Sequence, residues 1–303
     1  MIENAFSGII AYTVTPYSND EKRINFEVLH TLIDQLIDSG ANVIAALGSA
    51  GECAYLDDDE WRLVAKSTID YVNKRVPVLV GIVDLTTADA VVHARLAEEY
   101  GADAIMVSPF SYYPLSEDEI FDHYAAISAA ISIPIMIYNN PVTCGVDMSP
   151  EFMLSMIETI DNATMIKESS GDIQRMRSLY RLSKGSVRFF NGCNYLALEA
   201  LNAGAKGWST AAPCLIDDLP KQVIDAFNRG DVDKAKILFE RQLPLLEFIV
   251  AGGLASTVKA GLEINGLSVG YARRPLKPLT SNKIKILKGI IETIRTSGGK
   301  KCD

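Results

Sequence analysis

The sequence predicts an α/β protein, a (β/α)8 TIM barrel with a C-terminal helical appendage. Eight short apolar runs occur between residues 8 and 210, and none shows the polar alternation of a half-solvated sheet. A helical pattern follows each of the first seven runs. This alternation implies a parallel sheet with right-handed crossovers, and eight units favour a closed barrel. An open doubly wound sheet is the alternative, but no GxGxxG turn follows the first run.

The strand predictions rest on local composition. Each run is short and rich in β-branched, aromatic or other apolar residues, as in "VPVLVGIV", the third of them. The predicted strands are residues 8–14, 42–47, 76–83, 103–108, 134–139, 164–169, 187–192 and 206–210.

The helix predictions rest on amphipathic patterns with start and stop signals. Acidic residues begin the pattern over 57–73, where the helix dipole favours them, and Gly40 and Gly101 end two other patterns. The predicted helices are residues 25–39, 57–73, 86–100, 116–131, 149–159, 172–183, 194–203, 217–228, 231–250, 253–264 and 281–296. We therefore assign residues 1–215 to the barrel, and 216–303 to its closing helix and a C-terminal helical region.

Composition and charge exclude several classes of protein. The 303 residues are 48% hydrophobic and carry a net charge of −9, with no basic patch for nucleic acid and no segment suited to a membrane. The N-terminus lacks the features of a signal peptide, so we expect a cytoplasmic protein. The five cysteines, Cys302 among them, form no CxxC pair and no zinc-like spacing with the histidines. We expect reduced thiols and no metal.

Polar residues at the ends of three predicted strands indicate a site. Active sites of such barrels lie at the C-terminal ends of the strands. Lys167 ends the sixth strand, Tyr138 ends the fifth, and "GSAGE" (48–52) follows the second, whereas Lys206 begins its strand. Burial would lower the lysine pKa from about 10.4, and a neutral amine can form a Schiff base with a ketone. The alternatives are an ion pair with Glu168 or an amine extended to solvent.

The other polar residues of these loops have two interpretations each. Tyr138 could transfer protons at the amine, or could be an ordinary strand tyrosine. The small residues around Ser49 could bind a carboxylate through backbone N–H groups, or form a plain tight turn. "SYYP" places Tyr112 and Tyr113 at the same face of the barrel, as packing or interface aromatics or as functional groups.

Three motifs together resemble one family. "GSAGE", "YNNP" and "IKESSGD" stand in the order and at the spacing of the dihydrodipicolinate synthase/N-acetylneuraminate lyase family, class I lyases that form Schiff bases on a (β/α)8 barrel. The likeness covers nearly the whole chain, including "GAKGWST" and "ARRPLKP". It implies a 2-oxo acid, usually pyruvate, bound as an imine on Lys167 without a cofactor.

The resemblance also assigns roles to other residues. It implies a substrate carboxylate against the amides of Ser49 and Ala50, and a proton relay through Tyr138, Ser49 and a tyrosine of the neighbouring subunit. That tyrosine maps onto Tyr112, with Tyr113 as the alternative. The resemblance also implies a homo-oligomer, a dimer of tight dimers, because the family commonly forms this assembly. The remaining expected substrate-binding residues are Gly51, Thr143, Ser169, Gly192 and Asn194.

Departures from the family pattern bear on the substrate. Ala50 stands where a second hydroxyl residue is common, and Thr143 where an arginine binds the second substrate of the true synthases. Asn194 and Tyr195 replace the acidic pair of the sialic-acid lyases. We therefore predict a lyase or aldolase for pyruvate or another small 2-oxo acid. A dehydratase or deaminase of a hydroxylated pyrroline carboxylate or of a 2-keto-3-deoxy sugar acid is an alternative, as is a non-catalytic barrel that binds small acids.

Overall fold

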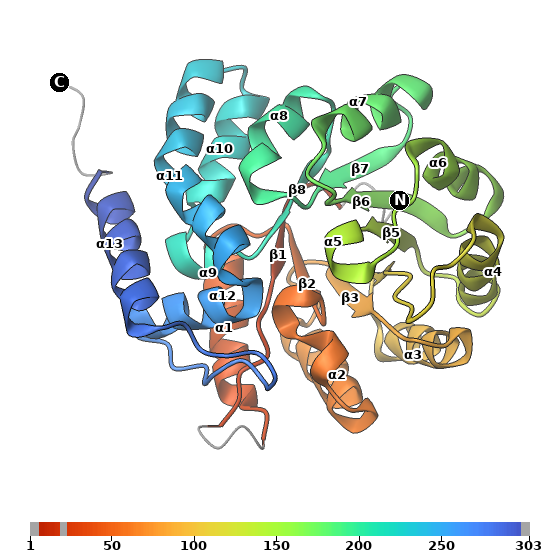
Figure 1. The fold of residues 1–303 in the computed structure, drawn as a ribbon, viewed down its shortest axis with the longest axis horizontal. Helices are drawn as coiled ribbons and strands as arrows, with labels where there is room; N and C mark the ends of the chain where they lie inside the picture. The colour runs from red at the N-terminus through yellow and green to blue at the C-terminus, as the bar shows by residue number, and fades with distance from the viewer. Residues whose placement is uncertain (1–5, 19–22, 298–303) are drawn as a thin grey trace.

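The computed structural model describes residues 6–18 and 23–297 and contains a closed barrel of parallel strands (Figure 1). Residues 1–5, where a signal peptide would begin, and Cys302 lie outside the described residues. Each strand pairs with the next, and the last pairs with the first, which confirms the predicted fold class. The strands are β1 (Gly8–Tyr12), β2 (Val43–Ala46), β3 (Val78–Ile82), β4 (Ala104–Val107), β5 (Ile135–Asn139), β6 (Ala163–Glu168), β7 (Arg188–Asn191) and β8 (Gly207–Thr210).

Helices cover the outside of the barrel at the predicted places. Capping residues explain their starts: Asp57 forms a capping box with Glu60 ahead of α2, and Ser116 forms one with Glu119 ahead of α4. The barrel helices are α1 (Phe26–Asp38), α2 (Asp58–Val72), α3 (Thr87–Tyr100), α4 (Glu117–Ser128), α6 (Pro150–Thr159), α7 (Ile173–Leu182), α8 (Ala197–Asn202) and α10 (Leu219–Asn228).

Several short turns at the strand ends were not predicted. They are the 3₁₀ turns Ser49–Gly51, Cys53–Tyr55 and Asn194–Leu196 and the short helices α5 (Pro141–Cys144) and α9 (Pro213–Ile216). The helix predicted over 194–203 therefore starts with a separate 3₁₀ turn. Elements of three or four residues are shorter than the window over which a hydrophobic period can be recognised.

The C-terminal helices lie along one flank of the barrel (Figure 1). They are α11 (Val232–Gly252), α12 (Leu254–Ile264) and α13 (Ser281–Ser297), and they follow α10, which packs on β1. α12 contacts the turn Ser49–Gly51, and α11 contacts the turn Asn194–Leu196. Both turns follow C-terminal ends of barrel strands, so the appendage reaches the mouth where we expected the site.

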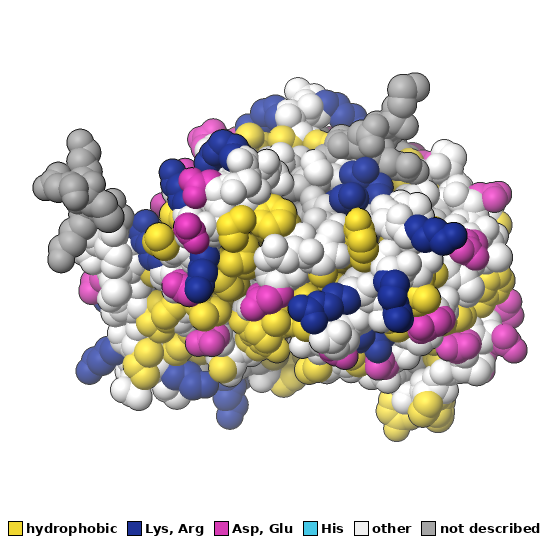
Figure 2. Space-filling view, turned by 90° about the horizontal axis from the view of Figure 1, so that it is seen from above, with side chains coloured by type: hydrophobic (Ala, Val, Ile, Leu, Met, Phe, Trp, Pro, Cys, Tyr) yellow, Lys and Arg dark blue, Asp and Glu magenta, His cyan; other side chains and the backbone are white. Residues whose placement is uncertain are grey.

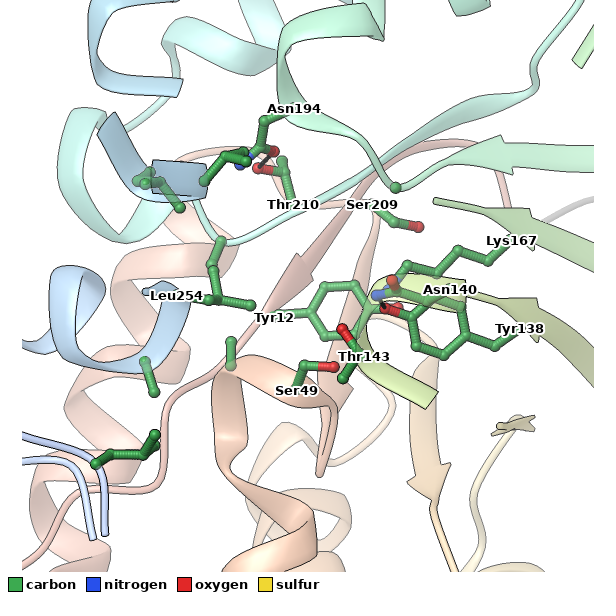
Figure 3. Close-up of a pocket in the computed structure, with 17 residues that line it drawn as sticks. Tyr12, Ser49, Tyr138, Asn140, Thr143, Lys167, Asn194, Ser209, Thr210 and Leu254 are labelled. Carbon is green, nitrogen blue, oxygen red and sulfur yellow. Dashed lines mark hydrogen bonds between the residues drawn. The ribbon is translucent and has the colours of Figure 1, made fainter. Parts of the chain in front are cut away.

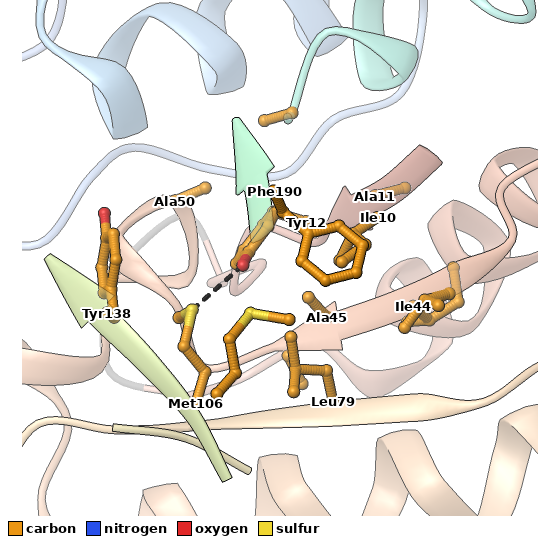
Figure 4. Close-up of a cluster of buried hydrophobic side chains, with 14 of the residues drawn as sticks. Ile10, Ala11, Tyr12, Ile44, Ala45, Ala50, Leu79, Met106, Tyr138 and Phe190 are labelled. Carbon is orange, nitrogen blue, oxygen red and sulfur yellow. Dashed lines mark hydrogen bonds between the residues drawn. The ribbon is translucent and has the colours of Figure 1, made fainter. Parts of the chain in front are cut away.

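Apolar side chains from alternate strands fill the barrel interior. Ile10, Leu79 and Met106 are fully or almost fully buried there, and the Tyr12 hydroxyl donates a hydrogen bond to the Met106 sulfur at 3.1 Å (Figure 4). Closure of the barrel depends on Gly207, because a Cβ there would lie 2.2 Å from the Gly8 carbonyl oxygen.

Charged side chains of both signs are interspersed over the face shown in Figure 2. No continuous basic patch covers that face. A search of the described helices finds none with the length and apolar character needed to cross a bilayer.

Candidate active site

Lys167 and Tyr138 lie side by side at the C-terminal ends of β6 and β5. They are partners in the register of the two strands, and their side chains are only 6% and 4% exposed. The lysine Nζ lies 3.9 Å from the centroid of the Tyr138 ring and 4.2 Å from that of the Tyr12 ring (Figure 3). The amine therefore sits between two aromatic faces inside the barrel mouth.

Tyr12 is a site residue that the sequence reasoning missed. It is the last residue of β1, and Tyr138 is the next-to-last residue of β5, so the same strand-end rule could have found it. Its hydroxyl donates to Met106, and burial raises its pKa, so the phenol stays protonated.

Burial lowers the pKa of Lys167 from its ordinary 10.5 to about 7. Negative charge on Cys144 or Cys53 would oppose this change. However, burial also raises the pKa of both thiols, that of Cys53 to about 12, so neither is charged near neutral pH. No carboxylate of the described residues forms an ion pair with Lys167. A substantial part of the amine is therefore neutral near pH 7.

Glu168, the suspected ion-pair partner of Lys167, faces the other side of the sheet. Successive side chains of a strand point to opposite faces, so Lys167 faces the barrel interior and Glu168 faces the surrounding helices. The Glu168 carboxylate accepts hydrogen bonds from Asn139 Nδ2 at 3.0 Å and Ser170 N at 2.6 Å, and it pairs with Arg175 at 3.3 Å. The ion-pair alternative for Lys167 is therefore wrong.

The Tyr138 hydroxyl accepts a hydrogen bond from Asn140 Nδ2 at 2.7 Å. Burial raises the pKa of Tyr138, so the phenol keeps its proton at neutral pH. A protonated phenol that already accepts one hydrogen bond can still donate its own proton. This combination suits a group that passes protons to a neighbouring atom.

A buried ion pair supports the turn Ser49–Gly51 from behind. Glu52 ends this turn in the left-handed conformation, with φ 57°, and is almost fully buried. Its carboxylate pairs with Lys259 Nζ of α12 at 2.6 Å and accepts from the Arg273 backbone N–H at 2.6 Å. No local pattern could predict this link, because its partners lie about two hundred residues apart in the chain.

A cavity of about 300 Å³ opens at this end of the barrel (Figure 3). The predicted site residues that line it are Lys167, Tyr138, Ser49, Ala50, Thr143, Gly192 and Asn194. The lining residues that sequence reasoning missed include Tyr12, Asn140, Ser209, Thr210, Ile249, Val250, Leu254 and Leu276. The last four belong to α11, α12 and the loop before α13, so the C-terminal region forms one wall of the site.

Two predicted substrate-binding residues lie behind the lining rather than in it. The Gly51 carbonyl accepts a hydrogen bond from Thr15 Oγ1 at 2.6 Å, away from the cavity. Ser169 packs against Gly192: a Cβ on that glycine would lie 1.8 Å from Ser169 Oγ and 2.8 Å from Lys167 Cε. Gly192 is therefore required for the lysine stem to pass, and Ser169 has a packing position.

Tyr112 does not reach the cavity of its own chain. It is 84% exposed, its neighbour Tyr113 is 72% exposed, and the two rings form an edge-to-face pair with centroids 5.0 Å apart. Within the single chain, Tyr112, in the segment between β4 and α4, is therefore not among the residues that line the cavity.

Sequence and structure comparisons place these observations among known proteins. Residues 5–294 match the Dihydrodipicolinate synthetase family. The 4-hydroxy-tetrahydrodipicolinate synthase of Bacillus subtilis is 29% identical, over 95% of this chain and 99% of the relative. One of the two such synthases of Halalkalibacterium halodurans is 31% identical, over 96% and 99%.

Solved structures agree with this result. A crystal structure from Pseudomonas aeruginosa, whose proposed identity is a dihydrodipicolinate synthetase, is 50% identical with a TM-score of 0.94, over 96% of this chain and all of that one. The dihydrodipicolinate synthase of Bacillus anthracis is 29% identical with a TM-score of 0.90, over 95% and 98%.

Proposed function

This chain belongs to the dihydrodipicolinate synthetase family and is a lyase, and from that premise we propose that it acts on pyruvate or another small 2-oxo acid through an imine on Lys167. The observation that carries the proposal is the buried amine, which lies between two aromatic rings and forms no ion pair among the described residues. Burial lowers the pKa of Lys167 to about 7, which favours the neutral form near physiological pH. A neutral amine attacks a ketone, whereas an ammonium group cannot.

The proposed reaction begins with attack of the Lys167 amine on the keto carbon. Loss of water then gives a protonated imine, which withdraws electrons from the neighbouring carbon. Loss of a proton from that neighbouring carbon gives an enamine, which forms a carbon–carbon bond by attack on a second carbonyl compound. In the reverse direction, cleavage of that bond leaves the enamine, which takes up a proton, and in either case water finally hydrolyses the imine. Tyr138 would carry protons to and from the substrate oxygen, and the backbone N–H groups around Ser49 would hold the carboxylate. Every group used belongs to the protein, the substrate or water, so we propose no cofactor.

Reductive trapping tests this function. Incubation with pyruvate and borohydride should add to Lys167 the mass of pyruvate, less one water and plus two hydrogens, as located by peptide mass spectrometry. The rate of adduct formation should rise with pH up to about 7 and level off above it, because only the neutral amine attacks. A small-acid-binding protein without catalysis would give no adduct with pyruvate or other 2-oxo acids. The dehydratase alternatives share the imine and would also be trapped.

We also propose that the protein forms a tight dimer in which Tyr112 enters the cavity of the partner subunit, and that two dimers pair. Two neighbouring tyrosines with exposed rings support a covered position in an assembly, because large aromatic surfaces on a monomer commonly mark an interface. Tyr113 is the alternative donor.

Single substitutions distinguish the two tyrosines. Tyr112→Phe should lower kcat by about 10²-fold, because it removes one hydroxyl from the proton relay and keeps the ring. Tyr113→Phe is the matched control and should remain close to wild type. Light scattering should show a dimer or larger assembly for both variants. Full activity of both variants would show that no tyrosine relay between subunits is needed. A loss confined to Tyr113→Phe would assign the relay to Tyr113 instead of Tyr112.

A further inference from the structure

We propose that the part of the substrate beyond the keto acid is uncharged, with an apolar body and an oxygen that accepts a hydrogen bond from Asn194. This inference rests on the proposed function, because it takes the keto acid to be held on Lys167. It concerns the opposite end of the same cavity, where Asn194, Thr210 and the C-terminal helices meet (Figure 3).

The orientation of the Asn194 amide follows from its neighbours. Its Oδ1 accepts from Trp208 Nε1 at 3.3 Å and from Thr210 Oγ1 at 2.8 Å. An indole N–H can only donate, so Trp208 fixes the amide oxygen on its side; the Thr210 hydroxyl, which accepts from Ala212 N at 3.0 Å, then donates its proton to that oxygen. The oxygen of the amide must therefore face these two donors, whichever way the group is first drawn.

The NH₂ group of Asn194 therefore points away from these two donors and can donate hydrogen bonds to another group. Asn194 is 7% exposed and lines the cavity, and its Nδ2 has no hydrogen-bond partner among the described residues. This Nδ2 is not one of the fully buried atoms without a partner, so it is accessible from the cavity, where a ligand oxygen can replace water as its acceptor. A turned amide would set its NH₂ group against the Trp208 N–H, so the NH₂ group stays on the cavity side and selects an acceptor rather than a donor at this point.

The wall next to Asn194 is apolar. Ile249 and Val250 from the end of α11, Leu254 from the start of α12, and Leu276 line it. Figure 3 shows the Leu254 side chain directed toward Tyr12, across the space that a ligand on Lys167 would extend into. Such a wall favours alkyl groups and gives few partners to a chain of hydroxyl groups.

Among the described residues, Lys167 alone brings a charged group to the cavity. Every other side chain that lines it is neutral. A second carboxylate would lose its hydration in this cavity without meeting a cation, which is unfavourable. The volume of about 300 Å³ lies at the small end of ligand sites, so the fragment is short.

Trapping of three 2-oxo acids with tails of nearly equal shape tests the inference without assuming a reaction. The probes are 2,5-dioxohexanoate with a methyl ketone, 2-oxo-5-methylhexanoate with an isopropyl group, and 2-oxoglutarate with a carboxylate. Each condenses with the Lys167 amine through its C2 ketone with loss of one water, and borohydride then delivers a hydride to the imine carbon and, in 2,5-dioxohexanoate, also to the free C5 ketone. Only these reduced adducts are counted; the pyrrole that this 1,4-diketone can form with an amine by loss of a second water has a different mass and is excluded. The readout is the probe concentration that gives half-maximal adduct.

The methyl ketone should be trapped at the lowest concentration, the isopropyl compound next, and 2-oxoglutarate at a concentration at least about tenfold higher than the ketone. Asn194→Leu should remove the advantage of the ketone over the isopropyl compound. Thr143→Arg should favour 2-oxoglutarate by about tenfold or more, because Thr143 is exposed at the cavity edge and arginine binds carboxylates. Thr143→Val is the matched control and should leave the order unchanged.

Other outcomes overturn the inference. It fails if wild-type protein traps 2-oxoglutarate as readily as the ketone, or if pyruvate is trapped and none of the three probes is. An unchanged ketone preference in Asn194→Leu would show that Asn194 does not bind the tail of the substrate. If Asn194→Leu fails to fold, Thr143→Arg still tests the charge argument separately. Absence of every adduct, including that of pyruvate, instead refutes the proposed function itself.

Discussion

Replacement of Lys167 by methionine is expected to abolish the borohydride-dependent adduct and to lower kcat by at least about 10⁴-fold, as loss of a covalent nucleophile does elsewhere. Methionine keeps most of the buried stem and removes only the amine. Lys206→Met is the matched control, because Lys206 is exposed at the other end of the barrel and should not contribute. Substantial turnover by Lys167→Met, or an equal loss in Lys206→Met, would contradict the imine mechanism.

The same variant should be more stable than wild type near neutral pH. The pKa of Lys167 is lowered in the folded state, so the unfolded chain binds more protons between about pH 7 and 10.5. Burial of the ammonium form therefore costs stability at low pH, on the order of a few kcal/mol, and this cost decreases as pH rises through that window. Denaturant unfolding at pH 7 and pH 10 should show the stability gain of Lys167→Met shrinking at the higher pH.

Tyr138→Phe is expected to lower kcat by about 10²–10⁴-fold with a smaller change in KM, because the ring beside the amine remains and only the proton-carrying hydroxyl is lost. Tyr12→Phe provides the control at nearly the same distance from Lys167. The Tyr12 proton already bonds the Met106 sulfur, so its loss should have little effect on kcat. Retention of full activity in Tyr138→Phe, or an equal loss in Tyr12→Phe, would remove Tyr138 from the proton relay.

Local sequence was sufficient for the barrel and for the centre of the site. Each strand is a short apolar run that could be recognised by itself, and the regular alternation with helices leaves few topologies. Lys167, Tyr138 and Ser49 could be grouped before any coordinates were known, because the C-terminal ends of parallel strands meet at one edge. That grouping depends on topology alone and not on side-chain contacts.

Side-chain direction and long-range contacts were decided only by the tertiary structure. The strand pleat turns Glu168 away from the amine that it follows in sequence, and Ser169 packs behind Gly192 instead of lining the cavity. Tyr112 has no place in the cavity of its own chain.

The walls of the cavity show the same division most clearly. The sequence pattern determined the positions of the lysine and the tyrosine at the strand ends. Three other features depend on residues far apart in the chain: the place of Leu254 in the wall, the pair of Lys259 with Glu52, and the orientation of the Asn194 amide. The physical reason is that a pattern of period two or 3.6 records which face of an element is buried, but not which distant element covers it. Burial of Lys167 inside the closed barrel, beside Tyr12 and Tyr138, also lowers its pKa, on which the proposed chemistry depends.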